Sequence, residues 1–553
     1  MIQDLLKKRI LVIDGAMGTA LQARNLTAED FGGPEFEGCN ENLVLTRPDV
    51  IRDIHESYLK AGCDIIETNT FGSTPMVLDE FALGFKAREI NVTAARIAKE
   101  AAVKFSTPEQ PRFVAGSIGP TTKAISVTGG VTFAQLREQF REQAVGLLEG
   151  GVDYLLIETC QDTRNIKAAF LGCEDAMSAT GVTVPMALSV TIEAMGTMLG
   201  GQSIEALLAS VAHKDLLYLG LNCATGPEFM TDFIRSLAEN SPFPVACVPN
   251  AGLPDENGCY LETPTMVSNV LGRFIDRGWL NVIGGCCGTH AGHVESLTNL
   301  ARGKTPHVSK APKRSFVSGV DFLEITDEMR PVIVGERTNV IGSRKFKKMI
   351  VDEKFDEASD IARAQIKGGA QILDVCLANP DRDETSDMER FLELVVKKVR
   401  VPLMIDSTDE KVIEVSLSYS QGKAIINSIN LEDGEERYEK VVPLAKSYGA
   451  ALVVGTIDDD PEQGMGVSRE RKLAIAERSY KLLTEKYGVA PEDIYWDPLV
   501  FPCATGDQQY VGSAVETIEG IRLIKERFPG TRTILGISNV SFGLPEAGRE
   551  VLN

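Results

Sequence analysis

The chain alternates short aliphatic runs with longer segments in which apolar residues recur at helical spacing. A first series of such runs lies within residues 1–301, and segments such as 47–62 and 132–151 follow the runs with a helical pattern and glycine near the end. The expected strands are 9–16, 63–71, 112–120, 152–160, 184–191, 217–223, 244–251 and 281–288. Eight successive strand–helix units favour a closed (β/α)8 barrel over an open sheet.

A second series of strands follows the basic, proline-containing segment "RGKTPHVSKAPKRSFVSG", which has no periodicity. Its expected strands are 331–339, 370–377, 401–408, 423–429, 451–457, 493–500 and 532–540. A parallel barrel without its last strand leaves two edges open, so we expect a second barrel cut after its seventh strand, with an unusual seven-stranded form as the alternative. The prediction is an α/β chain of two tandem (β/α)8 TIM-type barrels: a domain at 1–301, a linker at 302–325, and a second domain at 326–553, incomplete at its C-terminus.

Composition and charge exclude several classes of function. The formal net charge of −21 argues against a nucleic-acid surface and against an anionic membrane. No apolar run approaches the roughly 20 residues that span a bilayer, and the N-terminus lacks the pattern of a signal peptide. Eleven cysteines, an odd number in a large chain, fit free thiols in a reducing compartment. We therefore expect a cytoplasmic monomer that binds neither nucleic acid nor membranes.

Polar residues gather at the carboxyl ends of the expected strands in both series. This is the face at which (β/α)8 barrels carry their chemistry, so two such mouths predict an enzyme. The first mouth holds Asp14, Glu67, Asn69, Glu158, Asn222, Cys223, Asn250, Cys286 and Cys287. The second holds Glu336, Asn339, Asp374, Asp406, Asn427, Asp497 and Asn539.

Three cysteines are candidates for a metal site in the first mouth. Cys223 ends the sixth expected strand and the adjacent pair Cys286 and Cys287 ends the eighth, so a closed barrel brings three thiols together. Three thiolates suit Zn²⁺ and leave its fourth position open for a substrate thiolate. The alternatives are buried apolar cysteines, a vicinal disulfide, or a closed structural site completed by His290 or His293, which we expect instead to cap or sit on the following helix.

The motifs "DGAMGT", "TNTFGS", "IETCQD", "GLNCATGP", "PNAG" and "GGCCGT" together resemble the barrel of zinc-dependent homocysteine S-methyltransferases. The resemblance covers the whole first barrel. It implies that Cys223, Cys286 and Cys287 ligate zinc and that Asn250 lies near the metal. It also implies that Asp14, Gly15, Ala16 and Glu158 bind homocysteine, although Asp14 alone could instead cap the following helix.

Acids and amides on the strand ends of the second barrel are suited to a flat heterocycle. Carboxylates accept hydrogen bonds from an N–C–NH₂ edge, while carboxamides pair with a ring carbonyl. Phosphate recognition is not expected, because the sequence has no P-loop and no GxGxxG motif after a strand. For each acid taken singly, a salt bridge at the barrel mouth is an equal alternative.

The motifs "GERTN", "LDVCLAN", "IDS", "INSIN", "WDP" and "GISNVSFGLP" resemble the methyltetrahydrofolate-binding members of the pterin-binding family. This resemblance implies that Asp406, Asn427 and Asp497 read the pterin ring and that Glu336, Asn339 and Asn539 line the site. Asn539 is the position associated with N5, which must gain a proton before its methyl group leaves. Relatives often have "LDVN" where this chain has "LDVC", which leaves the role of Asp374 open.

The two barrels together resemble the N-terminal half of cobalamin-dependent methionine synthases. That resemblance implies a methyl group passing from 5-methyltetrahydrofolate to cobalamin, and then to zinc-bound homocysteine. None of the five histidines lies in an Asp-x-His-x-x-Gly cobalamin loop. We therefore expect cobalamin to be bound by a domain absent from this chain or by a separate corrinoid protein.

Four alternatives to this interpretation are open. One is a homocysteine methyltransferase fused to a methylenetetrahydrofolate reductase, which would bind flavin. Another is a corrinoid-independent methyltransferase that uses betaine or S-methylmethionine. The others are a structural zinc protein, and a second barrel like dihydropteroate synthase that binds a pterin without transferring methyl.

Overall fold

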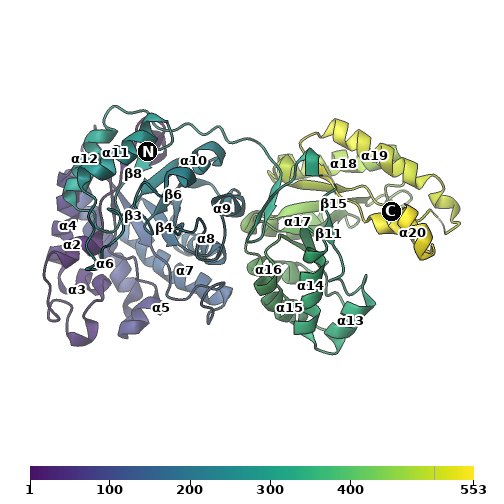
Figure 1. Cartoon of the computed structure of the whole chain (residues 1–553), viewed down its shortest axis with the longest axis horizontal. Helices are drawn as coiled ribbons and strands as arrows, with labels where there is room; N and C mark the ends of the chain where they lie inside the picture. Colours follow the sequence, from purple (N-terminus) through teal and green to yellow (C-terminus); the bar gives the residue numbers. More distant parts are fainter. Residues whose placement is uncertain (330, 504, 553) are drawn as a thin grey trace. The chain divides into compact units, whose positions relative to one another are not determined.

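The computed structural model describes residues 1–329, 331–503 and 505–552 (Figure 1). It divides into two compact units, one of residues 1–208 and 214–312 and the other of residues 209–213 and 313–553. Both units are built from parallel strands that alternate with helices. Within the described residues, no helix combines the length and apolar character needed to cross a bilayer. Each unit is described separately below.

The first unit is a closed barrel of eight parallel strands. Its strands are β1 (Leu11–Val12), β2 (Ile65–Glu67), β3 (Phe113–Ile118), β4 (Tyr154–Cys160), β5 (Met186–Val190), β6 (Leu216–Asn222), β7 (Val245–Val248) and β8 (Val282–Ile283). The sheet order runs β1-β8-β7-β6-β5-β4-β3-β2, and a parallel bridge between Ile13 and Ile65 joins the two ends. The predicted first barrel is therefore confirmed.

Helices surround this barrel. They are α1 (Ile2–Leu6), α2 (Met17–Gln22), α3 (Leu43–Thr46), α4 (Pro48–Lys60), α5 (Pro75–Leu78), α6 (Ala87–Phe105), α7 (Phe133–Gly150), α8 (Thr163–Thr180), α9 (Ile204–Val211), α10 (Thr231–Asn240), α11 (Pro264–Asp276) and α12 (Ala291–Ala301). Local sequence sets their ends, as α7 illustrates. Thr132 and Gln135 form a reciprocal capping box at its start, and Gly151, with φ of +87°, ends it.

A half-buried ion pair lies where the first barrel closes. Arg9 donates from both terminal nitrogens to the two carboxylate oxygens of Asp64, at 2.9 and 2.8 Å. The same carboxylate accepts the backbone N–H of Val12 at 3.0 Å. Asp64 is only 2% exposed, so it ties the segment before β1 and β1 itself to the start of β2.

The barrel interior is filled below its mouth by apolar side chains and two tyrosines. Tyr154 and Tyr218 are fully buried, their rings meet edge to face at 5.9 Å, and their hydroxyl groups lie 2.9 Å apart. Each buried hydroxyl thus has a partner within the core. The barrel is therefore a packed core that opens only at the carboxyl ends of its strands.

The second unit has the seven parallel strands that the sequence predicts. They are β11 (Val334–Gly335), β12 (Ile372–Val375), β13 (Leu403–Asp406), β14 (Ile425–Leu431), β15 (Ala451–Asp458), β16 (Ile494–Asp497) and β17 (Arg532–Thr533). They pair in sequence order, so β11 and β17 are the edges of the sheet. The predicted incomplete second barrel is confirmed.

Helices again follow the strands. They are α13 (Arg344–Val351), α14 (Phe355–Lys367), α15 (Glu384–Lys398), α16 (Glu410–Tyr419), α17 (Glu436–Tyr448), α18 (Arg469–Lys481), α19 (Ser513–Arg527) and α20 (Glu546–Leu552). The buried faces of α14, α15 and α17 combine small and aliphatic residues with larger side chains such as Phe355, Phe391 and Tyr438, as the amphipathic pattern indicates.

A hairpin that the sequence analysis did not anticipate lies within the predicted linker range. Strands β9 (Phe316–Ser318) and β10 (Phe322–Glu324) pair antiparallel. Val317 is fully buried and packs in one cluster with residues of β12 to β16. Gly319 approaches the Val401 carbonyl so closely that a Cβ there would lie 2.4 Å from its oxygen. The hairpin therefore plugs the amino-terminal end of the second barrel.

We expect Asp64→Ala to destabilise the first barrel by about 2–4 kcal/mol, because it leaves the Arg9 guanidinium and the Val12 N–H without their partner. Asp276→Ala is the matched control, since it breaks an exposed pair with Lys304 and should change stability by less than about 1 kcal/mol. Urea unfolding followed by Trp279 fluorescence, in a Trp496→Phe background, measures both. Equal stabilities for the two variants would contradict the closing role of Asp64.

Candidate functional site

Three cysteines meet at the mouth of the first barrel. Cys223 directly follows β6, while Cys286 and Cys287 lie in the loop after β8. Their sulfur atoms all lie within 4.8 Å of one another, and those of Cys223 and Cys287 are 3.9 Å apart. The thiols converge although 63 residues separate Cys223 from Cys286 because β6 and β8 both flank β7.

The backbone conformation at the strand ends orients these three thiols toward one another. Cys223 and Ala224 have φ of +58° and +56°, a left-handed region that costs non-glycine residues about 1 kcal/mol or more each. Hydrogen bonds hold the cysteine pair in place: the Cys286 N–H donates to the Pro249 carbonyl, and the Cys287 carbonyl accepts from Ala251 N–H. Strain at Cys223 is thus maintained by the surrounding strand ends, a common arrangement at functional sites.

The sulfur geometry fits a zinc ion. Two sulfurs held about 2.3 Å from one tetrahedral zinc lie about 3.8 Å apart, close to the Cys223–Cys287 separation. Hydrogen bonds from the neighbouring thiols hold the pKa of Cys287 well below its usual range, which favours the thiolate form that a metal needs. His290 and His293 are engaged elsewhere, because His290 caps α12 and His293 Nε2 lies 3.0 Å from the Glu262 carbonyl.

Three carboxyl groups share the same mouth: Asp14, Glu67 and Glu158. Asp14 and Glu158 are 3% and 7% exposed, and none of the three has an ion-pair partner among the described residues. Asp14 Oδ2 accepts the Glu67 N–H at 3.1 Å, and Glu158 accepts from the Ser117 hydroxyl. Burial raises the pKa of Asp14 and Glu67 well above normal and that of Glu158 to about 7. A cationic group such as an ammonium placed beside this cluster would favour the ionised carboxylates and lower these pKa values, so the cluster is suited to such a ligand.

The other predicted residues of the first mouth lie beside this cluster. Gly15 packs against the Tyr58 ring, where a Cβ would lie 2.8 Å from a ring carbon. Ala16 accepts the Tyr58 hydroxyl at 3.0 Å through its carbonyl. Asn250 is 4% exposed, and its side-chain oxygen is buried without a partner, as is Asp14 Oδ1. Unpaired buried oxygens of this kind are suited to N–H donors of a ligand.

Glu67 is the residue of the acid cluster to which the sequence analysis gave no role. Its sequence signal was its position at the end of β2, which it shares with other strand-end polar residues. Only the fold shows that it interacts electrostatically with Asp14 and Glu158.

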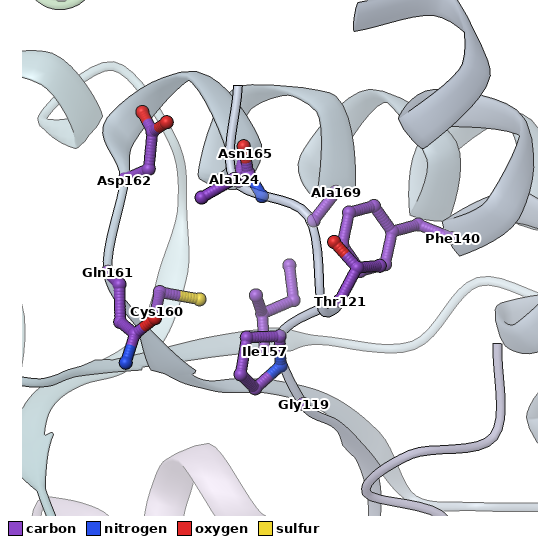
Figure 2. Close-up of a pocket in the computed structure, with 11 residues that line it drawn as sticks. Gly119, Thr121, Ala124, Phe140, Ile157, Cys160, Gln161, Asp162, Asn165 and Ala169 are labelled. Carbon is purple, nitrogen blue, oxygen red and sulfur yellow. The ribbon is translucent and has the colours of Figure 1, made fainter. Parts of the chain in front are cut away.

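A small pocket adjoins this mouth between the loop after β3 and the start of α8 (Figure 2). Asp162 and Asn165 pin the loop over it by accepting the N–H groups of Ser126 at 2.6 Å and Ile125 at 3.0 Å. Apolar Ile157 and Phe140 form much of its lining. None of the predicted site residues lines this pocket, so we assign it a structural role.

In the second unit, an amide links two acids at the mouth. Asn339 donates to Asp374 at 3.4 Å and to Asp406 at 3.0 Å through the same nitrogen. Asp374 is 2% exposed and has one oxygen without a partner. Burial, and then the Asp406 charge, raise the pKa of Asp374 to about 8, while burial raises that of Asp406 to about 6. Asp374 is therefore an acid that keeps its proton near neutral pH.

The remaining predicted residues of this mouth are less tightly grouped. Asn427 acts to lower the pKa of Asp374, and Glu336 is exposed but influences both acids electrostatically. Asp497 ends β16, where its Oδ1 accepts the Leu499 N–H at 2.9 Å. Asn539 is exposed on a short 3-10 helix, and no described side-chain hydrogen bond joins it to the others.

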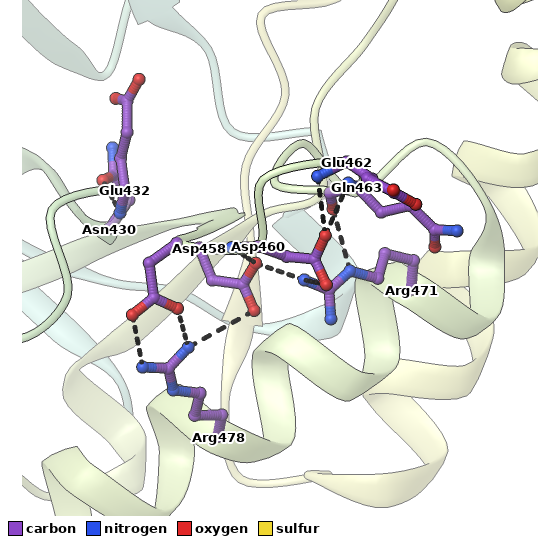
Figure 3. A network of polar contacts seen from close by, with 9 residues as sticks. Asn430, Glu432, Asp458, Asp460, Glu462, Gln463, Arg471 and Arg478 are labelled. Carbon is purple, nitrogen blue, oxygen red and sulfur yellow. Dashed lines mark hydrogen bonds and ion pairs between the residues drawn. The ribbon is translucent and has the colours of Figure 1, made fainter.

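The end of β15 carries a structural ion-pair network instead of a binding site (Figure 3). Arg471 pairs with Asp458 and donates to the Gln463 carbonyl at 2.9 Å, while Arg478 pairs with Asp459 and lies 3.5 Å from Asp458. Both arginines come from α18 and fold the loop that follows β15. Asp458 and Asp459 are not among the predicted site residues, and their ion pairs with α18 have a structural role.

Comparisons with known proteins identify related families. Residues 11–301 match the family model described as homocysteine S-methyltransferase, and residues 335–552 match that described as pterin binding enzyme. Methionine synthases of Mycobacterium tuberculosis (strain ATCC 25618 / H37Rv) and Mycobacterium leprae (strain TN) are each 39% identical over 100% of this chain and 46% of their own length. The chain thus spans about half the length of these curated relatives.

Solved structures of similar fold include the metallated homocysteine methyltransferase MmuM from Escherichia coli. It is 22% identical, has a TM-score of 0.44, and the match covers 53% of this chain and 96% of that one.

We expect Cys287→Ser to abolish stoichiometric zinc binding, because a hydroxyl is a far weaker zinc ligand than a thiolate. Cys259→Ser is the matched control, since Cys259 is exposed on the neighbouring loop and lies outside the sulfur cluster. Atomic emission of protein purified with zinc present gives the metal content of each variant. Full zinc in Cys287→Ser would show that the cluster is not the metal site.

Proposed function

Because the chain belongs to the homocysteine S-methyltransferase family, whose model matches more than half of it, we propose that its first barrel methylates the sulfur of homocysteine. The observation that carries this proposal is the meeting of three thiols and three carboxyl groups at one mouth, with Asp14 and Glu158 buried and Glu67 half-buried. The cysteines can hold a metal that binds a substrate thiol, and the carboxyl groups can bind a substrate ammonium. Homocysteine carries both groups.

Each group has a role in this proposal. Cys223, Cys286 and Cys287 would hold zinc. Bound zinc would keep a substrate thiol deprotonated near neutral pH while leaving its sulfur electron-rich. Asp14, Glu67 and Glu158 orient the amino acid by binding its ammonium, and Asn250 offers its unpaired oxygen close to the cysteine loop. Gly15 and Ala16 form the wall that Tyr58 supports.

We propose that the second barrel binds 5-methyltetrahydrofolate, the methyl donor. The match to the pterin-binding family and the acid–amide cluster support this proposal. Asp406, Asn427 and Asp497 would accept or donate hydrogen bonds along the edge of the pterin, while Glu336, Asn339 and Asn539 border it. The protonated Asp374 carboxyl is the group best suited to supply the proton that N5 needs.

Transfer between the two barrels requires a carrier, which we propose to be cobalamin held by a further domain or by a separate corrinoid protein. The curated relatives named methionine synthase support this choice. When bound, cobalamin supplies a strong nucleophile that accepts a methyl group and then donates it to a thiolate. The product of the whole sequence is methionine.

Zinc-edge X-ray absorption tests the first-barrel proposal. Adding homocysteine should raise the zinc sulfur count from three to four, because the substrate thiolate takes the open position. Homoserine, which has a hydroxyl in place of the thiol, is the control and should leave three sulfurs. An unchanged count with homocysteine would indicate a structural zinc site and contradict the proposed activity.

The pH dependence of methyl transfer from 5-methyltetrahydrofolate to free cob(I)alamin tests the role of Asp374. Its acid form is populated below a pKa of about 8 and is lost as pH rises through that value, so the rate should fall above about pH 8. Asp374→Asn should remove this fall in rate at alkaline pH and slow methyl transfer by about 100-fold. The exposed neighbour Asp381→Asn is the control. An unchanged profile in Asp374→Asn would assign the proton to another group.

A further inference from the structure

Lys472 is a fully buried lysine that the proposed chemistry does not use. It lies in the first turn of α18 and is 0% exposed. Its ammonium donates to the Gly466 carbonyl at 2.6 Å and to the Pro498 carbonyl, and it lies 5.2 Å from the centre of the Phe501 ring. Among the described residues it forms no ion pair, unlike its neighbour Arg471, which pairs with Asp458. Burying an ammonium without a paired carboxylate costs free energy, so we expect Lys472 to have a functional role.

The carbonyl groups that Lys472 binds belong to the loops after two adjacent strands. Gly466 follows β15 and Pro498 follows β16, directly after Asp497. A Cβ on Gly520 would lie 2.6 Å from Lys472 Cδ, so α19 also packs closely on the lysine stem. The side chain therefore reaches from the outer helices to the mouth of the second barrel.

Three successive residues at the end of β16 are each held by a hydrogen bond. Asp497 accepts from the Leu499 N–H at 2.9 Å, Lys472 donates to the Pro498 carbonyl, and Thr517 donates to the Leu499 carbonyl at 2.9 Å. Leu499 has φ of +62°, a strained conformation for a leucine. This arrangement leaves the second Asp497 oxygen for a ligand and fixes its direction.

Lys472 also provides positive charge near the Asp497 carboxyl. Burial raises the pKa of Asp497, whereas the Leu499 N–H and the Lys472 charge lower it. Burial lowers the pKa of Lys472 to about 8, while the charges of Asp497 and Glu516 raise it. Glu516 is already paired with Arg469 at 2.5 Å. Of these two acids, Asp497 is thus the one without an ion pair among the described residues, and the Lys472 ammonium interacts with it electrostatically.

We infer that Lys472 is a positioning residue of the pterin site: it fixes the end of β16 through the Pro498 carbonyl, and its ammonium supports the neighbouring Asp497 carboxylate, which accepts pterin N–H groups. The inference rests on the proposed folate-binding function and deepens it. Lys472 does not itself contact the ligand in this assignment; it acts through Asp497 and Pro498.

The affinity for 5-methyltetrahydrofolate, measured by calorimetry from about pH 6 to about pH 8.5, tests this role. In Lys472→Met, Asp497 should take up a proton at higher pH than in the wild type, so binding should be about ten-fold weaker near pH 6 and recover to within about three-fold at the alkaline end. Lys481→Met makes the same change at an exposed site on the same helix and should bind as the wild type does.

Two further variants separate charge from packing. Lys472→Gln keeps an N–H donor for the carbonyls but lacks the charge, so it should show the same pH shift; it also decides the matter if Lys472→Met does not fold. In an Asp497→Asn background, Lys472→Gln should have no pH-dependent effect, because the titrating acid is gone.

The outcomes distinguish the inference from the function on which it rests. Affinities of Lys472→Gln that follow the wild type at every pH overturn the role of Lys472. A uniform loss at all pH values also overturns it, because that result indicates structural damage alone. No binding of 5-methyltetrahydrofolate by the wild type contradicts the proposed function itself.

Discussion

The first barrel depends on the pairing of its first and second strands. These strands lie at the two ends of the sheet order, and the Ile13–Ile65 bridge joins them while Asp64 binds Arg9 and the Val12 N–H. Without this contact the sheet would be open, and its strand ends would not surround a common mouth. Asp14 follows β1 directly and bonds to β2 through the Glu67 N–H, so closure also assembles the acid cluster.

The closed mouth then concentrates groups that repel one another. Three carboxyl groups and three thiols are brought together there: burial raises the pKa of Asp14 and Glu67, and hydrogen bonds with Cys223 and Cys287, followed by burial, raise that of Cys286. In the proposed function, a metal cation beside the sulfurs and an ammonium beside the acids would both favour the ionised forms of these groups. The left-handed backbone conformation of Cys223 is a source of strain at this mouth.

Sequence patterns predicted every barrel strand, because each strand is an aliphatic run bounded by recognisable helical segments. They also predicted the cysteine cluster, since strand order in a closed barrel places the ends of β6 and β8 on either side of β7. Glu67 and Lys472 could not be assigned in this way. Their roles depend on charge acting through space and on carbonyl groups of distant loops, which hydrophobic periodicity does not encode. The hairpin was hidden because its strands are three residues each in a basic, proline-containing stretch.

That hairpin has a consequence for how the second barrel folds during synthesis. Val317 leaves the ribosome before any of the strands it packs against, and Tyr495 in the same cluster follows 178 residues later. The apolar side chains of the hairpin therefore remain exposed to solvent while most of the barrel is translated. Such long sequence separation slows folding and exposes the chain to association with other chains. The second barrel is therefore assembled around a hairpin that is translated first.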